Sequence, residues 1–240
     1  MNIIAGGQYG LAFEDNNIVK EQRKFALKSL HEIGFGSAAL EDSVYHYAQE
    51  IVTRWTKMGN EHVDVTENII RAIGNVIWHV TFGINLEFDN PIILEFRRLQ
   101  LALIPLLASP FMMFVELFPI LRKIDFLIGS PTKRLMEVSS ESHVMLKEAI
   151  NTTQQSFNPD NEPSCYIEAF LAEQKNREEA GKPIGDAPRF HYKTTLHFSG
   201  NFHFEQMLNT LRMCFLQLVN NPEAQRQLQK EIDDVVGDRV

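Results

Sequence analysis

Apolar residues recur along this chain at the spacing of α-helices, and the alternation typical of strands is nearly absent. In residues 40–58 an apolar residue returns every three or four positions, which predicts an amphipathic helix. A second such pattern over residues 69–80 follows a capping-box-like start at residues 64–67 (DVTE) and ends at Gly83. Helices are also predicted after Ser164, which can cap one, and after residues 221–223 (NPE).

Polar segments containing proline separate these helices. Residues 152–164 and 181–188 each hold two prolines among polar residues, which predicts loops. Neither segment is long enough to require a separate domain, and no internal repeat or low-complexity tract is present. A single all-α domain is therefore the simplest prediction.

Two predicted helices carry residues that break the apolar pattern. Arg23 falls on the apolar face of the helix predicted over residues 18–30, so its guanidinium either snorkels, pairs with a local carboxylate or meets an anionic ligand. Ser199 and Gly200 lie inside a long helical pattern over residues 190–220, where a glycine predicts a close approach or a kink. The buried stripe expected there is Phe204, Met207, Leu208, Leu211, Cys214, Phe215 and Leu218.

Composition and charge narrow the classes of partner. The chain is 44% hydrophobic and 22% charged, which is close to the globular average. Its net charge of −8, without a dense Lys/Arg run, argues against a nucleic-acid surface. The two cysteines suggest a reducing compartment, and the eight histidines are too scattered to predict a metal site.

The most apolar stretch of the chain is Leu101 to Val115, within a region from Leu101 to Phe118 that is too apolar for a solvated loop. Its apolar run is shorter than the roughly 20 residues that cross a bilayer, and Pro105 and Pro110 interrupt it. We expect this stretch either to pack in the core or to dip into a membrane interface. The first ten residues lack a basic and an apolar region, so no signal peptide is expected.

Several short motifs occur in the order found in one enzyme family. Residues 9–13 (YGLAF) and 20–27 (KEQRKFAL) resemble a W-x-x-x-R helix and its approach, and residues 30–36 (LHEIGFG) match the turn that follows. Residues 167–171 (IEAFL) are similar to an I-D-A-F-L segment, and residues 218–237 resemble the helix after the long central one. Together these motifs resemble the amino-terminal half of the catalytic domain of a microsomal, drug-metabolising cytochrome P-450, a haem-thiolate monooxygenase.

The resemblance implies a partial cytochrome P-450 fold over residues 1–240, expected as one incomplete domain without the membrane anchor and the haem-thiolate half. It assigns Arg23 to a haem propionate, although Val19 stands where the family has tryptophan. Neither Cys165 nor Cys214 has the glycine-rich context of the axial ligand, so we expect both to be buried free thiols.

The family motif A-G-x-(D/E)-T, on the oxygen side of the haem, can be aligned in two registers. Anchoring it on Ser199 and Gly200 places His203 at the threonine position, with Phe202 at the acid. Anchoring it on residues 210–212 places Glu205 at the acid, and this register is favoured for the acid. The resemblance thus assigns Glu205 and His203 to catalysis, and Arg23, Ser199 and Gly200 to haem binding.

By resemblance, the expected reaction inserts one oxygen atom into a small apolar substrate, such as a xenobiotic, lipid or steroid. The implied partner is an NADPH reductase, and the implied location is the cytoplasmic face of the endoplasmic reticulum membrane. The chain by itself is expected to be catalytically incomplete. The alternative is a truncated all-α protein without catalytic activity that acts as an interaction module.

Overall fold

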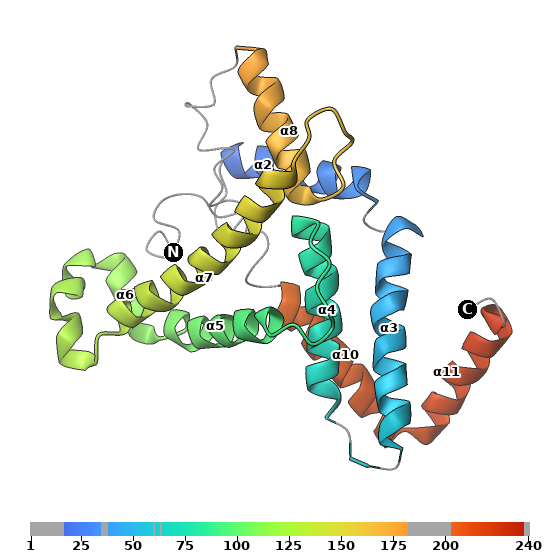
Figure 1. The fold of residues 1–240 in the computed structure, drawn as a ribbon. Helices are drawn as coiled ribbons and strands as arrows, with labels where there is room; N and C mark the ends of the chain where they lie inside the picture. The colour runs from blue at the N-terminus through green and yellow to red at the C-terminus, as the bar shows by residue number, and fades with distance from the viewer. Residues whose placement is uncertain (1–16, 35–37, 60, 63, 182–202, 238–240) are drawn as a thin grey trace.

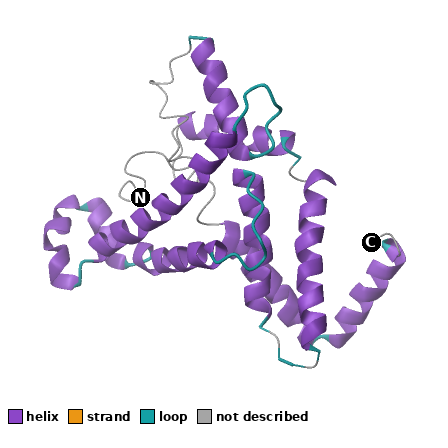
Figure 2. Ribbon diagram, viewed as in Figure 1, coloured by secondary structure: helices purple, strands orange, loops and turns teal. Residues whose placement is uncertain are grey.

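The structure is a computed structural model that describes residues 17–34, 38–59, 61–62, 64–181 and 203–237 (Figure 1). This part of the chain contains nine α-helices and one 3-10 helix, and it contains no strand (Figure 2). The elements are α2 (Asn17–Glu32), α3 (Ala38–Met58), α4 (Val65–Phe82), α5 (Ile92–Leu107), α6 (Pro110–Leu117), η1 (Pro119–Ile128), α7 (Pro131–Ser156), α8 (Tyr166–Glu179), α10 (His203–Asn220) and α11 (Pro222–Val235). The predicted all-α class is confirmed.

Helix α4 is the centre of the fold, because α3, α5, α7, α8 and α10 all pack against it. Its ends match the sequence: the Asp64 side chain accepts a hydrogen bond of 2.8 Å from the Thr66 backbone N–H, and Gly83 ends the helix at φ 71°. The Trp78 ring centroid lies 4.7 Å from that of Phe82 and 5.9 Å from that of Phe96. These contacts extend the core from α4 to α5.

The start of α8 packs against the end of α4. A Cβ at Gly83 would lie 3.2 Å from the Cys165 Sγ, so this position favours glycine for its positive φ and for this close approach. Ser164 precedes the N-cap residue, Cys165, so the prediction that Ser164 caps the helix is wrong by one residue. The Glu168 carboxylate instead accepts hydrogen bonds from the Ser164 N–H at 2.7 Å and its hydroxyl at 2.8 Å.

Helix α7 extends further than the sequence predicts. It runs to Ser156, so the loop predicted to begin at residue 152 begins after that residue. The Thr152 hydroxyl donates to the Glu148 carbonyl at 3.0 Å, and the Thr153 hydroxyl donates to the Phe82 carbonyl at 2.6 Å. Because these polar side chains find acceptors in α7 and α4, they remain compatible with a helix.

The apolar stretch from Leu101 to Phe118 is split between the core and the surface. Leu103, Met112 and Val115 are buried, whereas Phe114 and Phe118 are exposed. Pro105 lies inside α5, and Pro110 is in the first turn of α6. No helix of the described residues is long and apolar enough to cross a membrane.

The carboxy-terminal pair of described helices, α10 and α11, lies at the edge of the core. Helix α10 packs on α4, and α11 packs on α10 and projects from it (Figure 1). Among the described side chains of the stripe expected on α10, only Leu208 is fully buried, and Phe204 lies outside the described side chains. Met207, Leu211, Cys214 and Phe215 are exposed, and Leu218 is half-buried, because few described elements cover α10.

Candidate functional site

Helix α10 carries the residues expected to act in catalysis. It begins at His203, so His203 and Glu205 both lie in its first turn, within one helical turn of each other. Their side chains lie outside the described part of the structure, as do Ser199 and Gly200 entirely. The buried Leu208 fixes this end of α10 in the core.

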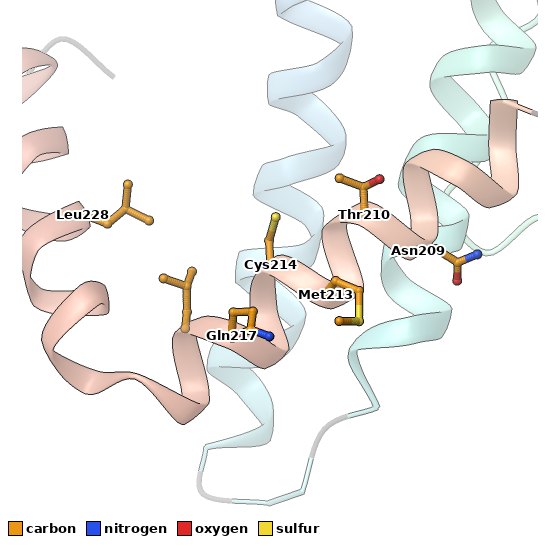
Figure 3. Close-up of a pocket in the computed structure, with 7 residues that line it drawn as sticks. Asn209, Thr210, Met213, Cys214, Gln217 and Leu228 are labelled. Carbon is orange, nitrogen blue, oxygen red and sulfur yellow. The ribbon is translucent and has the colours of Figure 1, made fainter.

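An open hollow of about 640 Å³ lies between α10 and α11. Helix α10 contributes all but one of its lining residues, and α11 contributes Leu228 (Figure 3). The lining residues are Asn209, Thr210, Met213, Cys214, Gln217, Leu218 and Leu228. A hollow with this mainly apolar lining can accommodate an apolar group, with one thiol beside it.

The turn between the two helices fixes the direction of α11. The Asn221 Nδ2 donates a hydrogen bond of 2.8 Å to the Gln217 carbonyl, which satisfies an acceptor near the end of α10. Pro222 then opens α11, and Gly237 beyond its end has φ 55°. The predicted bounds of this helix are therefore confirmed, although none of its residues is buried.

Arg23 lies on α2, as predicted, but it is exposed. Helix α2 packs against α8 through a face that includes Phe25, whose ring centroid lies 6.2 Å from that of Tyr166, and through the buried Ala26 and Ser29. This face is rotated away from Leu27, which is 70% exposed one helical turn after Arg23. The guanidinium of Arg23 is therefore not buried, and which of the three expected environments it occupies stays a prediction.

The two cysteines occupy contrasting environments. Cys165 is completely buried, and burial raises the pKa of its thiol to about 11, so it is a neutral thiol at physiological pH. Cys214 is exposed on α10, so the expectation of a buried thiol is correct for Cys165 and wrong for Cys214. The described residues contain no cluster of three or more His, Cys, Asp or Glu side chains that is able to hold a metal ion.

The described residues fit parts of a haem site. A haem requires cations for its carboxylates, an apolar surface for its ring and an axial ligand for its iron. Arg23 beside exposed Leu27 offers a cation next to an apolar surface, and α10 offers further exposed apolar side chains. Cys165, neutral and buried in the core, does not suit the axial position.

The residues that line the hollow were not singled out from the sequence as a site. Their spacing was a usable signal, because Thr210, Met213, Cys214 and Gln217 recur at the three- and four-residue intervals of one helix face. Leu228 could not be joined to them from periodicity alone. Its position depends on the angle between α10 and α11.

Comparison with known proteins identifies the family. The model of the family described as Cytochrome P450 matches residues 3–240. The chain is 27% identical over 237 residues to the probable cytochrome P450 CYP36A1 of Caenorhabditis elegans, covering 99% of this chain and 48% of that protein. It is 30% identical over 229 residues to cytochrome P450 2J3 of Rattus norvegicus, covering 95% of this chain and 44% of that protein.

A third relative is covered to a similar extent. Cytochrome P450 2M1 of Oncorhynchus mykiss is 26% identical over 233 residues, covering 97% of this chain and 45% of that protein. The chain therefore spans about half the length of the curated relatives that it matches. Because the family model matches nearly every residue, the chain belongs to the cytochrome P450 family.

Proposed function

We propose that this chain forms part of a haem-dependent monooxygenase that inserts one oxygen atom into a small apolar substrate. The observation that carries this proposal is the family match over residues 3–240. When bound, haem supplies the oxygen-activating chemistry, while the chain's own residues hold the cofactor and deliver protons. The substrate can be a xenobiotic, a lipid or a steroid, since an apolar site accepts each of these classes.

We further propose that residues 1–240 are one incomplete domain rather than several. In support, α2, α4, α5, α7, α8 and α10 contribute to one buried cluster that includes Ala26, Ile70, Phe96, Ile167 and Leu208. A division that separates any of these helices from the others would cut through this cluster. The chain spans about half of its relatives' length, so we expect further polypeptide to be needed for an active enzyme.

The experiment that tests the proposed function is a reduced carbon-monoxide difference spectrum of the purified 240-residue chain mixed with haemin. We expect no thiolate-type Soret band, because Cys165 is buried and neutral and Cys214 lies on an exposed face of α10. A chimaera that joins this chain to the remaining half of a related cytochrome P450 is expected to show the band and to oxidise an apolar substrate. A chimaera that folds and binds no haem would instead favour the non-catalytic interaction module.

Arg23 is the proposed partner of a haem propionate. Its exposed guanidinium is able to form a bidentate pair with a carboxylate, which a lysine does less well. In the chimaera, Arg23→Ala should weaken haem retention, and the matched change Lys24→Ala, at an exposed position of the same helix, should not. Equal haem retention in both variants would mean that Arg23 is a surface residue that does not bind a propionate.

Ser199, Gly200, Glu205 and His203 belong to the proposed oxygen-side helix. Ser199 and Gly200 are proposed to lie beside the haem, and Glu205 is proposed to relay protons through water to the bound oxygen. Loss of turnover with increased peroxide release in Glu205→Gln supports this role. If Glu205→Gln is fully active and His203→Ala is not, the upstream register of the motif is correct.

The proposed partner that donates electrons is an NADPH reductase, and the proposed location is the cytoplasmic face of the endoplasmic reticulum membrane. Helix α2 supports a docking surface of this kind, because Lys20, Lys24 and Lys28 are exposed at four-residue intervals. A reductase with an acidic docking surface would be steered toward this helix. Charge reversal at Lys24 should therefore slow electron transfer in the chimaera, most clearly at low salt.

The stretch from Leu101 to Phe118 is proposed to enter a membrane interface together with η1. The exposed apolar side chains of this region continue beyond Phe118. They are Leu101, Ile104, Phe114, Leu117, Phe118, Ile120, Ile124, Phe126 and Leu127. Such a patch is larger than a solvated loop tolerates and too short to span a bilayer.

Vesicle flotation tests this membrane proposal. Replacing Phe114 and Leu117 by serine should release the chain from vesicles, because both side chains are exposed. The matched control is Val219→Ser with Val235→Ser, since these residues are exposed on α10 and α11, outside the patch. Equal flotation of all variants would mean that the patch does not insert.

A further inference from the structure

A line of polar side chains runs along α4, the helix at the centre of the fold. Four polar residues follow one another at four-residue intervals on this helix: Glu67, Arg71, Asn75 and His79. The line begins at the surface, where Arg71 pairs with the exposed Glu67 at 2.8 Å. Asn75, one turn further along, is completely buried, although most of the other buried residues of α4 are apolar. A carboxamide in such a core requires hydrogen-bond partners.

The Asn75 carboxamide forms no hydrogen bond within the part of the chain that the structure describes. Both its Oδ1 and its Nδ2 are unbonded there, and so is the buried Nδ1 of His79, one turn further along α4. A carboxamide both donates and accepts hydrogen bonds, and leaving it unpaired in the core is costly. Two neighbouring side chains with buried unpaired atoms therefore indicate a polar ligand at this face of α4.

The segment between α4 and α5 covers this face. Residues 83–88 run back along α4 (Figure 2), and the Arg71 Nη1 donates a hydrogen bond of 3.4 Å to the Phe88 carbonyl. From Gly83 to Phe88 an extended chain spans about 17 Å, and from the end of α4 back to Arg71 the helix spans about the same length. The middle of the segment, near Leu86, therefore lies at the level of Asn75.

The backbone of this segment has hydrogen-bonding groups to offer. Ile84, Leu86 and Phe88 face the core and the residues between them are exposed, which is typical of extended chain. The Tyr47 hydroxyl donates to the Leu86 carbonyl at 3.2 Å. Among the described residues, the backbone N–H groups of residues 84–88 donate to no acceptor. Donors of the segment thus lie along the same face as a carboxamide oxygen that lacks one, and the two are not bonded directly.

We propose that ordered water binds at Asn75 and joins its carboxamide and the His79 Nδ1 to the backbone of residues 84–88. Water fits this site because it donates and accepts at once, and a buried water typically bonds about three polar partners. A metal ion is the less suitable occupant, because the described residues contain no cluster of three or more His, Cys, Asp or Glu side chains able to hold one. The site goes beyond the proposed oxygenase function and does not depend on it.

Nuclear magnetic resonance of the 240-residue chain tests for the water directly. The Asn75 side-chain NH2 should show nuclear Overhauser contacts with water, of the sign expected for a water that tumbles with the protein. Slow hydrogen exchange of this buried group should exclude exchange as their source. The matched control is the exposed Asn161 side chain, which should show no such contact because surface water leaves rapidly. An Asn75 NH2 without water contacts, or one that exchanges as fast as that of Asn161, would overturn the proposal.

The variant Asn75→Leu gives a second test, because the proposal and its alternative predict opposite shifts of the urea midpoint. Removing the carboxamide from a water site leaves the other partners of the water unpaired, so the midpoint should fall. Removing a carboxamide that has no partner should raise the midpoint, so a rise or no change would overturn the proposal. Asn85→Leu is the matched control, at an exposed position of the covering segment, and should leave the midpoint unchanged.

The two measurements together also identify another occupant. A lower midpoint for Asn75→Leu without water contacts in the parent chain would mean that a protein group bonds Asn75, which overturns the proposal. If Asn75→Leu does not fold, the water contacts of the parent chain decide the outcome alone.

Discussion

Helices α4 and α10 pack against each other, yet the same kind of periodic sequence produces opposite environments in them. On α4, Ile69, Ile70 and Ile73 are all buried, because five helices surround it. On α10, Met207 and Leu211 of the expected stripe are 48% and 40% exposed. Helical periodicity thus places apolar side chains on a face, but neighbouring elements decide whether that face becomes core.

The largest expected effect on stability comes from a substitution in the core around α4. Phe82→Ala should lower the free energy of unfolding by about 3–5 kcal/mol, since the ring is 2% exposed and contacts Trp78. Ile232→Ala on α11 should change it by less than about 0.5 kcal/mol, because that side chain is 48% exposed. Urea denaturation followed by far-ultraviolet circular dichroism measures both values.

Similar losses in the two variants would contradict the contrast between α4 and α11. They would mean that α11 is covered in solution by an element or a partner that stabilises the native state. Dilution of the protein separates these cases, because stabilisation by a second copy depends on concentration.

The sequence predicts local structure here better than it predicts burial. The start and end of α4 follow from Asp64 and Gly83, because a cap depends on neighbours within a few residues. The exposure of Arg23 and Cys214 depends on how α2 rotates against α8 and on what covers α10. These are long-range properties, so periodicity alone assigned Cys214 to the wrong environment and left that of Arg23 open.

In the candidate site, too, the sequence predicts local placement better than spatial arrangement. The sequence placed His203 and Glu205 on a helix, and α10 confirms this placement, while their catalytic roles stay predictions. The hollow lined by Cys214 and Leu228 depends on the angle between two helices, which no local pattern encodes. The helix end at Ser156 was also missed, because its hydroxyl-bearing residues bond within the helix and to α4.

The reactivities of the Cys165 and Cys214 thiols allow a direct comparison of the core around α4 with the exposed face of α10. At mildly alkaline pH, Cys214 should react with a disulfide reagent at least on the order of a hundredfold faster than Cys165, because burial suppresses the Cys165 thiolate. The measurement is the time course of thiol release in buffer and in urea. Cys214→Ser should remove the fast phase, and Cys165→Ser should leave it unchanged.

Two fast thiols in buffer would contradict this assignment. That result would place Cys165 in a region that opens readily, although it lies against Gly83 at the centre of the fold. A single fast thiol that survives Cys214→Ser would lead to the same conclusion.

A smaller effect is expected at the hydrogen bond that joins α7 to the end of α4. Thr153→Val keeps the shape of the side chain and removes the hydroxyl that donates to the Phe82 carbonyl at 2.6 Å. Because that contact is buried, we expect a loss of about 1–2 kcal/mol in the free energy of unfolding. The control is Thr152→Val, whose hydroxyl bonds only within α7 at an exposed position, and equal losses in both variants would contradict the prediction.

The smallest effect concerns ion pairs, which also differ between the two regions. Arg54 of α3 binds both carboxylate oxygens of Asp89, at 3.0 Å and 2.7 Å, and its guanidinium lies 4.4 Å from the centroid of the Phe88 ring. This pair ties α3 to the loop between α4 and α5. On α11, Arg226 pairs with Glu223 at 2.7 Å, but both residues belong to one exposed helix turn.

The hydrogen bond from Arg54 lowers the pKa of Asp89, so its contribution to stability is present above the ordinary carboxyl pKa and is lost as the pH falls through the lowered value. Asp89→Asn should therefore cost up to about 1 kcal/mol at neutral pH and progressively less toward pH 3, since the pair is partly exposed. Urea midpoints measured across this pH range test the prediction. Glu223→Gln is the matched control and should change little at any pH, because its partner lies on the same turn of an exposed helix. A constant loss for Asp89→Asn would assign its effect to packing rather than to charge, whereas a pH-dependent loss for Glu223→Gln would show that α11 is held as firmly as α3.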